Sequence, residues 1–290
     1  MNRSVAVDSL SHAYGERQAL ADVSFSVAPG EMVGLLGPNG GGKTTLFRIL
    51  ATMLRPTSGD ARLSGRSVLS DPHGVRAVLG VVFQRPSLDI KLTVMENLIH
   101  HGNLHGLSGG DLRRRSRKTL DALGLSDRAD DRVESLSGGL ARRVELAKSL
   151  LHEPAILLLD EPNTGLDPNA RRDFLDYLDN LRKRDGVTVL LTTHFLEEAE
   201  RCDRVGIMHE GRLVAYDTPS RLKDIVGDEV LVLSGPRMPE IRLDGPHVHR
   251  LASQLVDSFP EEISSYSWGR PTLDDVFVHL TGRTLKEVEA

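Results

Sequence analysis

The sequence predicts an α/β fold with a mainly parallel core sheet. Short, continuously apolar runs recur along the chain, and helical patterns fall between many of them, as in parallel sheets that are buried on both faces. Residues 1–30 instead read as short strands and turns, so we expect an N-terminal antiparallel β subdomain. The predicted strands are Val5–Val7, Phe25–Val27, Met32–Leu36, Leu79–Phe83, Ala155–Leu159, Val187–Leu191 and Val205–Met208.

The domain organisation follows from where these strand signals stop. Between about residues 85 and 152 helical patterns and charge replace them, so we predict a helical insertion there. The main domain is expected to span residues 1–220, and residues 221–290 to form a small α+β extension. We predict that this extension ends in a helix that Thr272 can cap and Gly282 can terminate.

The composition limits the classes of protein that fit. The chain has 290 residues, of which 39% are hydrophobic and 27% charged, so a sizeable core is expected and wholesale disorder is not. A net charge of −5 argues against nucleic acid as the main partner, and the single cysteine, Cys202, excludes an internal disulfide. The longest fully apolar run is Ala155–Leu159, whereas a span needs about 20 apolar residues. We therefore expect any membrane spans to come from another chain.

A glycine-rich loop lies between the predicted strand at residues 32–36 and a helical pattern. Gly37, Gly42, Lys43 and Thr44 fit the phosphate-loop pattern G-x-x-x-x-G-K-[ST]. Glycines let backbone N–H groups approach a phosphate chain, and the following helix points its positive end at the anion. The lysine can reach the β- and γ-phosphates, and the threonine hydroxyl can bind Mg²⁺. The predicted nucleotide contacts are Gly37, Pro38, Asn39, Gly40, Gly41, Gly42, Lys43, Thr44 and Thr45.

Two carboxylates end the predicted strand at residues 155–159. Asp160 is expected at the carboxyl edge of the sheet beside the phosphate loop, where Mg²⁺ needs an oxygen ligand. Glu161 is then positioned to orient or deprotonate an attacking water. The sequence thus predicts a metal ligand and a general base in adjacent positions.

A second potential anion site lies in the sequence LSGGLARRVELAKSL at residues 136–150. Ser137 can cap a helix, while Gly138 and Gly139 allow a ligand to approach the backbone closely. With GPNGGGKTT, LSGG and LLLDEP in this order, residues 3 to about 220 closely resemble the ATP-binding cassette (ABC) ATPases. The resemblance implies a phosphate-loop NTPase (RecA-like) core and a head-to-tail homodimer, in which Ser137 and Gly139 close over ATP held by the other subunit.

The same resemblance implies roles for four further residues. Tyr14 matches the aromatic residue that stacks on adenine, and Gln84 matches the glutamine that contacts Mg²⁺ and senses the membrane partner. His194 corresponds to the γ-phosphate switch histidine, and Asp167 to an aspartate at the dimer contact. The chain departs from the family pattern at Leu140, where glutamine is common, which puts in doubt a cross-subunit hydrogen bond at that position.

Two segments bear on what the ATPase drives. Residues 271–283 and 83–98 resemble bacterial ATPases that power efflux of drugs, polysaccharides or natural products, including the daunorubicin-resistance type. This implies a peripheral subunit on the cytoplasmic face of the cell membrane, docked on a separate polytopic permease. The alternatives are a soluble ABC ATPase acting on DNA or ribosomes, and an importer ATPase. No heptad array separates Lys43 from Ser137, as the DNA-repair members would require.

The sequence HHGNLH at residues 100–105 invites a metal-site interpretation. His101 and His105 can share one helix face, and imidazoles are common zinc ligands. Nearby glycines weaken the helix, and no third ligand is evident from the sequence. We therefore do not predict a metal site there.

Overall fold

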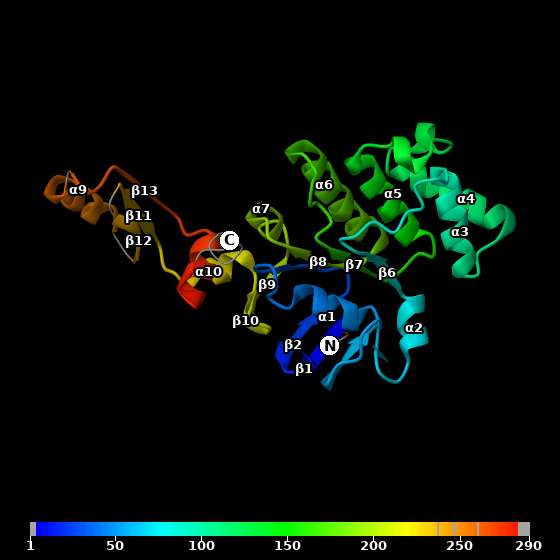
Figure 1. Cartoon of the computed structure of the whole chain (residues 1–290), viewed down its shortest axis with the longest axis horizontal. Coiled ribbons are helices and arrows are strands. Elements are labelled where there is room, and N and C mark those ends of the chain that lie inside the picture. Colours follow the sequence, from blue (N-terminus) through cyan, green and yellow to red (C-terminus); the bar gives the residue numbers. More distant parts are fainter. Residues whose placement is uncertain (1–3, 237, 246–247, 260, 284–290) are drawn as a thin grey trace.

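The computed structural model describes residues 4–236, 238–245, 248–259 and 261–283, and it confirms the predicted α/β fold class (Figure 1). Its central sheet has six strands in the order β10-β9-β3-β8-β7-β6. All neighbouring strands in it are parallel except the β9–β10 pair. The strands are β3 (Met32–Leu36), β6 (Leu79–Val82), β7 (Ile156–Asp160), β8 (Thr188–Thr193), β9 (Arg204–His209) and β10 (Arg212–Asp217).

The register of the central sheet positions the predicted site. Strands β3, β7 and β8 are buried on both faces, which explains their continuous apolar sequences. Asp160 at the end of β7 pairs with Thr192 of β8, and Leu36 at the end of β3 pairs with Thr193. The carboxyl ends of these strands therefore meet at one edge of the sheet, where ligands bind in open α/β folds.

The N-terminal β subdomain is an antiparallel sheet in the order β2-β1-β4-β5. Its strands are β1 (Val5–Tyr14), β2 (Arg17–Val27), β4 (Ser58–Leu63) and β5 (Arg66–Ser67), followed by helix α2 (Pro72–Ala77). The first two strands extend well beyond the predicted 5–7 and 25–27, because their outer halves alternate between buried and exposed side chains. Helix α1 (Lys43–Leu50) packs in one hydrophobic cluster with this sheet and the central sheet.

The helical insertion consists of α3 (Val94–Leu104), α4 (Gly109–Ala122) and α5 (Gly138–Leu150), with short 3₁₀ turns at Ser126–Arg128 and Val133–Ser135 between α4 and α5. Thr93 and Glu96 form a capping box at the start of α3. As predicted, Ser137 caps α5 by accepting a hydrogen bond from the Leu140 backbone N–H. In Figure 1 these helices cover one side of the central sheet beside α6 (Pro168–Asp185).

The C-terminal part follows α7 (Leu196–Ala199) and α8 (Pro219–Asp224). Strands β11 (Val230–Gly235), β12 (Met238–Asp244) and β13 (Ser265–Gly269) form a small antiparallel sheet with α9 (Val248–Ser258), which projects from the main body in Figure 1. The last described helix, α10 (Leu273–Thr281), has the predicted Thr272 cap and ends at Gly282. This helix returns to pack in the large core cluster of the main body. Among the described helices, none is long and apolar enough to cross a membrane.

Candidate active site

The phosphate loop connects β3 to α1, and its glycines are fixed by close neighbours. Gly42 has φ 100°, and a Cβ there would lie 2.7 Å from the Ala19 carbonyl oxygen. A Cβ on Gly37 would lie 2.2 Å from the Met208 carbonyl oxygen. Neither position accepts a side chain without displacing backbone. The start of α1 has no acidic residue and no side-chain cap in the described structure, so its N–H groups can bind an anion.

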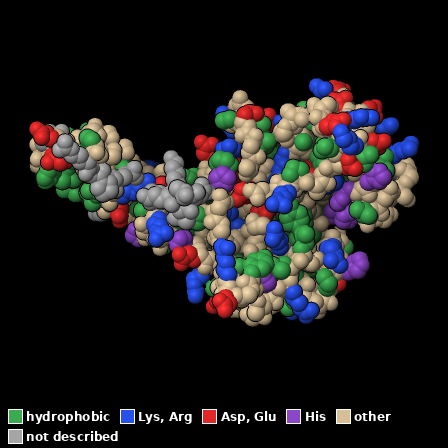
Figure 2. All heavy atoms as spheres, in the orientation of Figure 1, with side chains coloured by type: hydrophobic (Ala, Val, Ile, Leu, Met, Phe, Trp, Pro, Cys, Tyr) green, Lys and Arg blue, Asp and Glu red, His purple; other side chains and the backbone are tan. Residues whose placement is uncertain are grey.

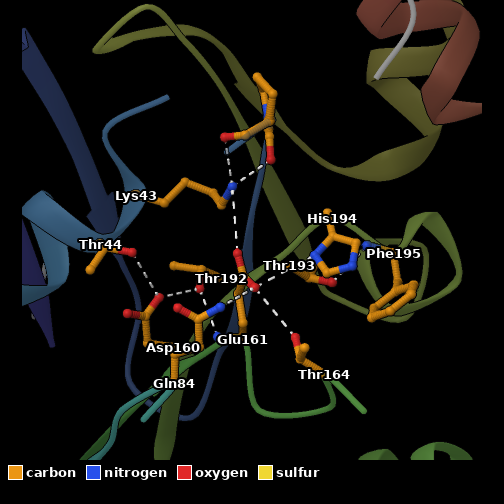
Figure 3. Close-up of polar contacts among 12 residues, drawn as sticks. Lys43, Thr44, Gln84, Asp160, Glu161, Thr164, Thr192, Thr193, His194 and Phe195 are labelled. Atoms are coloured by element: carbon orange, nitrogen blue, oxygen red, sulfur yellow. Dashed lines mark hydrogen bonds and ion pairs between the residues drawn. The ribbon is translucent and has the colours of Figure 1, made fainter. Parts of the chain in front are cut away.

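Lys43 places a buried positive charge at this loop. Its side chain is only 4% exposed, and its Nζ donates hydrogen bonds to the carbonyl oxygens of Gly37 and Pro38. The same Nζ lies 4.0 Å from Glu161 Oε1, as Figure 3 shows. The cavity at the loop is lined by Tyr14, Arg17, Ala19, Pro38, Asn39, Gly40, Gly42, Lys43, Thr44, Thr45 and Glu161.

The structure brings Asp160 next to the phosphate loop, as the sequence predicts. Its Oδ1 accepts a hydrogen bond from Thr192 Oγ1 at 2.7 Å and lies 3.5 Å from Thr44 Oγ1. Burial raises the pKa of Asp160, against the opposing effect of the Thr192 hydrogen bond. A buried carboxylate and a hydroxyl that face one another are the oxygen donors that Mg²⁺ prefers.

Polar side chains from several segments converge on Glu161. Its Oε2 accepts hydrogen bonds from Gln84 Nε2 at 3.1 Å and Thr164 Oγ1 at 3.3 Å, and it lies 3.7 Å from His194 Nδ1 (Figure 3). The backbone of Glu161 adopts φ 45°, which is uncommon for a residue with a side chain. Its N–H is held by Thr192 Oγ1 at 2.9 Å. The surrounding residues therefore fix this carboxylate in one position at the cavity.

Comparisons with known proteins agree with this geometry. The profile of the family described as "ABC transporter" matches residues 20–164. The Nod factor export ATP-binding protein I of Paraburkholderia xenovorans (strain LB400) is 39% identical, with 98% of this chain and 99% of that protein covered. The daunorubicin resistance ATP-binding protein DrrA3 of Streptomyces coeruleorubidus is 38% identical, with 98% of each covered. This chain belongs to the ABC transporter family.

Solved structures support the same assignment. A structure described as the ATP-binding subunit of an ABC transporter superposes with a TM-score of 0.72 at 28% identity, covering 96% of this chain and 99% of that one. The dimeric cassette MJ0796, bound to ADP and phosphate, superposes with a TM-score of 0.68 at 28% identity, covering 74% and 98%. The predicted family and enzyme class are confirmed: this ABC ATPase is the ATP-binding and ATP-hydrolysing subunit of a transporter.

The four residues that the family resemblance places near the other subunit lie outside the cavity of the single chain. Ser137 and Gly138 are exposed at the start of α5, and Gly139 is half-buried beside Leu166. Asp167 caps α6 by accepting hydrogen bonds from the backbone N–H groups of Asn169 and Ala170. None of the four lines the phosphate-loop cavity in the described structure.

Leu140 departs from the family pattern at the next position of α5. Its side chain packs against the large hydrophobic cluster of the main body. An apolar residue at this position therefore contributes to the core that supports α5.

Two residues of the ABC ATPase site were missed from the sequence. Arg142 of α5 is only 9% exposed and donates hydrogen bonds to the carbonyl oxygens of Phe83 (2.7 Å), Pro162 (2.8 Å) and Asp160 (3.2 Å). Burial lowers the pKa of Arg142, with a counteracting effect from nearby carboxylates. Arg17 lines the cavity and lies near Gly40. The sequence feature that could have indicated it is a basic residue three positions after Tyr14.

Proposed function

We propose that this ABC ATPase powers export through a separate polytopic membrane permease. The observation that carries the proposal is the end-to-end similarity to an ATP-binding protein named for Nod factor export, which covers 98% of this chain and 99% of the relative. The similarity therefore extends past the ATPase motifs into residues 271–283. We further propose that the chain acts as a peripheral subunit on the cytoplasmic face of the membrane, without nucleic acid.

Binding of ATP is proposed to use the residues that line the phosphate-loop cavity. Tyr14 lines this cavity and is 45% exposed, and we propose that its ring stacks on adenine. The backbone N–H groups of Gly37 and residues 39–45 then surround the phosphates, and the Lys43 ammonium neutralises part of their charge. Arg17 adds a second positive charge at the same cavity.

The oxygen donors fit a Mg²⁺ ion. Asp160 Oδ1 and Thr44 Oγ1 lie 3.5 Å apart, and burial raises the pKa of Asp160, so a divalent cation would relieve an unfavourable buried charge. We propose that Thr44, Asp160 and the Gln84 side chain hold the ion. When bound, it neutralises phosphate charge and orients the terminal phosphate.

Hydrolysis is assigned to the group around Glu161. We propose that the Glu161 carboxylate orients and deprotonates the attacking water, since it is fixed beside the cavity by Gln84 and Thr164. His194, 3.7 Å from the same carboxylate, is placed to contact the terminal phosphate. Lys43 is placed to stabilise the charge that develops in the transition state.

A head-to-tail homodimer is proposed to complete each site. The exposed helix start at Ser137, Gly138 and Gly139 offers a hydroxyl, open backbone N–H groups and the positive end of α5 to an anion. On the same surface Asp167 is exposed and positioned to meet the partner subunit. The dimer would therefore bring the missing donors to the cavity of the other chain.

We also propose the division into a main domain at residues 1–220, with its insertion at 85–152, and an extension at 221–290. The support is that β11, α9 and their neighbours enclose a small hydrophobic cluster of their own. Helix α10 then ties the extension back to the main body, because Leu273, Val276 and Phe277 pack in the large cluster.

A mixing experiment tests the shared site. Lys43→Ala and Ser137→Ala chains are each expected to lose about 100-fold in ATPase rate, as for loss of a transition-state donor. In a head-to-tail heterodimer of the two, one of the two sites is intact, so mixing should restore up to about a quarter of the wild-type rate. The control mixes the Lys43→Ala chain with a chain that carries both Lys43→Ala and Ser137→Ala. In that heterodimer neither site is intact. If the ATPase rate recovers in neither mixture, the result contradicts the head-to-tail dimer.

Export itself is tested in membranes. Tagged ATPase, solubilised with mild detergent, is expected to copurify with a polytopic membrane protein, whereas stable ribosome or DNA association would contradict the transport role. Inside-out vesicles that contain both chains then receive ATP and a compound that stimulates their ATPase rate. Accumulation in the lumen supports export, and ATP-driven loss from preloaded vesicles indicates import.

A further inference from the structure

Three histidines come together where the helical insertion meets the central sheet. His101 lies in the last turn of α3, His105 caps that helix, and His152 lies in the turn after α5. One ring nitrogen of each lies within 4.8 Å of those of the other two. Histidine side chains gather beside α3 in Figure 2. The third histidine, which the sequence did not reveal, comes from a distant segment of the chain.

The hydrogen bonding of His152 is that of a metal ligand. Its Nε2 lies 3.0 Å from the Leu79 carbonyl oxygen, which can only accept, so the proton is on Nε2. Its Nδ1 therefore carries the lone pair, and this buried atom has no hydrogen-bond partner among the described residues. Metal-binding histidines characteristically donate their other N–H to a carbonyl or carboxylate, which fixes the tautomer and the ring.

The charged group closest along α5 does not prevent cation binding at the cluster. The Lys148 Nζ lies 3.7 Å from Glu145 Oε1 and 3.2 Å from the Ser87 carbonyl oxygen. These oxygen atoms offset part of its charge.

We propose that His101, His105 and His152 bind one divalent transition-metal ion, for which Zn²⁺ is the best match. Three neutral imidazoles and one open position accessible to water are a common zinc ligand set. The His101 and His152 rings are half-buried, whereas the His105 ring is exposed. Water would therefore reach the fourth coordination position of the ion from the His105 side.

The geometry requires one local adjustment. The His105 and His152 rings are stacked, with centroids 3.9 Å apart and planes 10° from parallel, so their lone pairs do not yet converge. Tetrahedral zinc bonds of about 2.0–2.1 Å place ligand nitrogens about 3.4 Å apart. Because His105 is exposed at the end of α3, its ring can turn to another rotamer without disturbing the core.

The proposed ion would connect three elements. It would join the end of α3 to the end of α5, and His152 would link both to β6 through the Leu79 carbonyl oxygen. Since α5 begins at Ser137, the ion would lie about 20 Å from that residue along the helix. None of the three histidines lines the phosphate-loop cavity, so the proposed metal site is separate from it.

Zinc titration of the tag-free, full-length ATPase tests the site. Nucleotide-free and Mg²⁺-free protein is titrated with ZnCl₂ in the presence of a chromophoric chelator, and X-ray absorption of the loaded protein identifies the ligands. We expect one tightly bound ion per chain with three imidazole ligands. His105→Gln should weaken binding more than about 10-fold, because even outer-shell partners account for about 10- to 100-fold in metal affinity.

Matched variants make the result specific. His100→Gln removes an adjacent exposed histidine outside the cluster and should leave zinc affinity unchanged. His105 is preferred to His152 for the test because loss of the exposed ring leaves the Leu79 hydrogen bond intact. ATP affinity and the unfolding midpoint without zinc should match wild type in both variants. Equal zinc affinity and stoichiometry in His105→Gln and His100→Gln would overturn the proposal, as would absorption data without three imidazoles.

Discussion

Replacing Arg142 with methionine tests whether α5 fixes the backbone beside Gln84 and Glu161, the residues to which we assign hydrolysis. The guanidinium donates to the carbonyl oxygens of Phe83 at 2.7 Å and Pro162 at 2.8 Å, and more weakly to Asp160 at 3.2 Å. Hydrogen bonds to a charged group contribute about 1.5–3 kcal/mol each, so the two short ones together contribute about 3–6 kcal/mol. Methionine also removes the cost of burying a charge, which offsets part of this loss. We therefore expect the free energy of unfolding to fall by about 2–4 kcal/mol.

The same change should lower the ATPase rate at saturating ATP more than it changes the KM for ATP. Arg142 does not line the phosphate-loop cavity, but its acceptors belong to residues that flank Gln84 and Glu161. Misplacement of a catalytic group by about 1 Å can reduce a rate about 100-fold. Urea unfolding of nucleotide-free protein measures the stability, and steady-state phosphate release measures kcat and KM.

Arg143→Met is the matched control, since it lies at the next position of the same helix. In the described structure Arg143 makes a 3.4 Å hydrogen bond to Asp173 on the surface. Its loss should change stability by less than about 1 kcal/mol. If Arg142→Met and Arg143→Met unfold at the same urea concentration, and Arg142→Met keeps its kcat, Arg142 does not hold the site.

Three further variants test the cavity directly. Glu161→Gln should bind ATP but hydrolyse it about 100-fold or more slowly, and light scattering should detect dimers with ATP and Mg²⁺; monomers alone would contradict the proposed sandwich. Gly42→Ala should abolish detectable ATP binding in calorimetry, because its Cβ would lie 2.7 Å from the Ala19 oxygen; wild-type affinity would disprove the requirement for glycine. Asp160→Asn should raise the thermal midpoint without Mg²⁺, since burial raises the pKa of Asp160 above its unfolded value and the ionised form at neutral pH is unfavourable. Wild-type stability should therefore fall as pH rises through that pKa, and a variant with the same pH dependence would refute this account.

The sequence predicts the parts of the site that depend on local chain geometry. The phosphate loop, the strand end at Asp160 and the helix cap at Ser137 each need particular residue types within a few positions. Spacing alone therefore places them on the correct elements. The approach of Asp160 to Thr44 then follows from the parallel order of the sheet.

Contacts between distant segments could not be predicted in this way. Arg142 lies off the apolar stripe of α5, where a charged residue is normally solvent-exposed. Its burial is explained by the carbonyl oxygens to which it donates, those of Phe83 and of residues 160–162. His152 meets His101 and His105 only because α5 packs against α3. Such partners depend on the tertiary arrangement and have no signature in the local sequence.

Helix α5 links these observations physically. At its start Ser137 is exposed, and between one and two turns later Arg142 holds the backbone beside Asp160. Further along, Glu145 accepts a 2.6 Å hydrogen bond from the Ser87 backbone N–H, in the segment that follows Gln84. Because a helix moves largely as one body, displacement of its start by a second subunit would shift both Gln84 and Glu161 together. We therefore propose that formation of the dimer and alignment of the Glu161 carboxylate are coupled through Arg142 and Glu145.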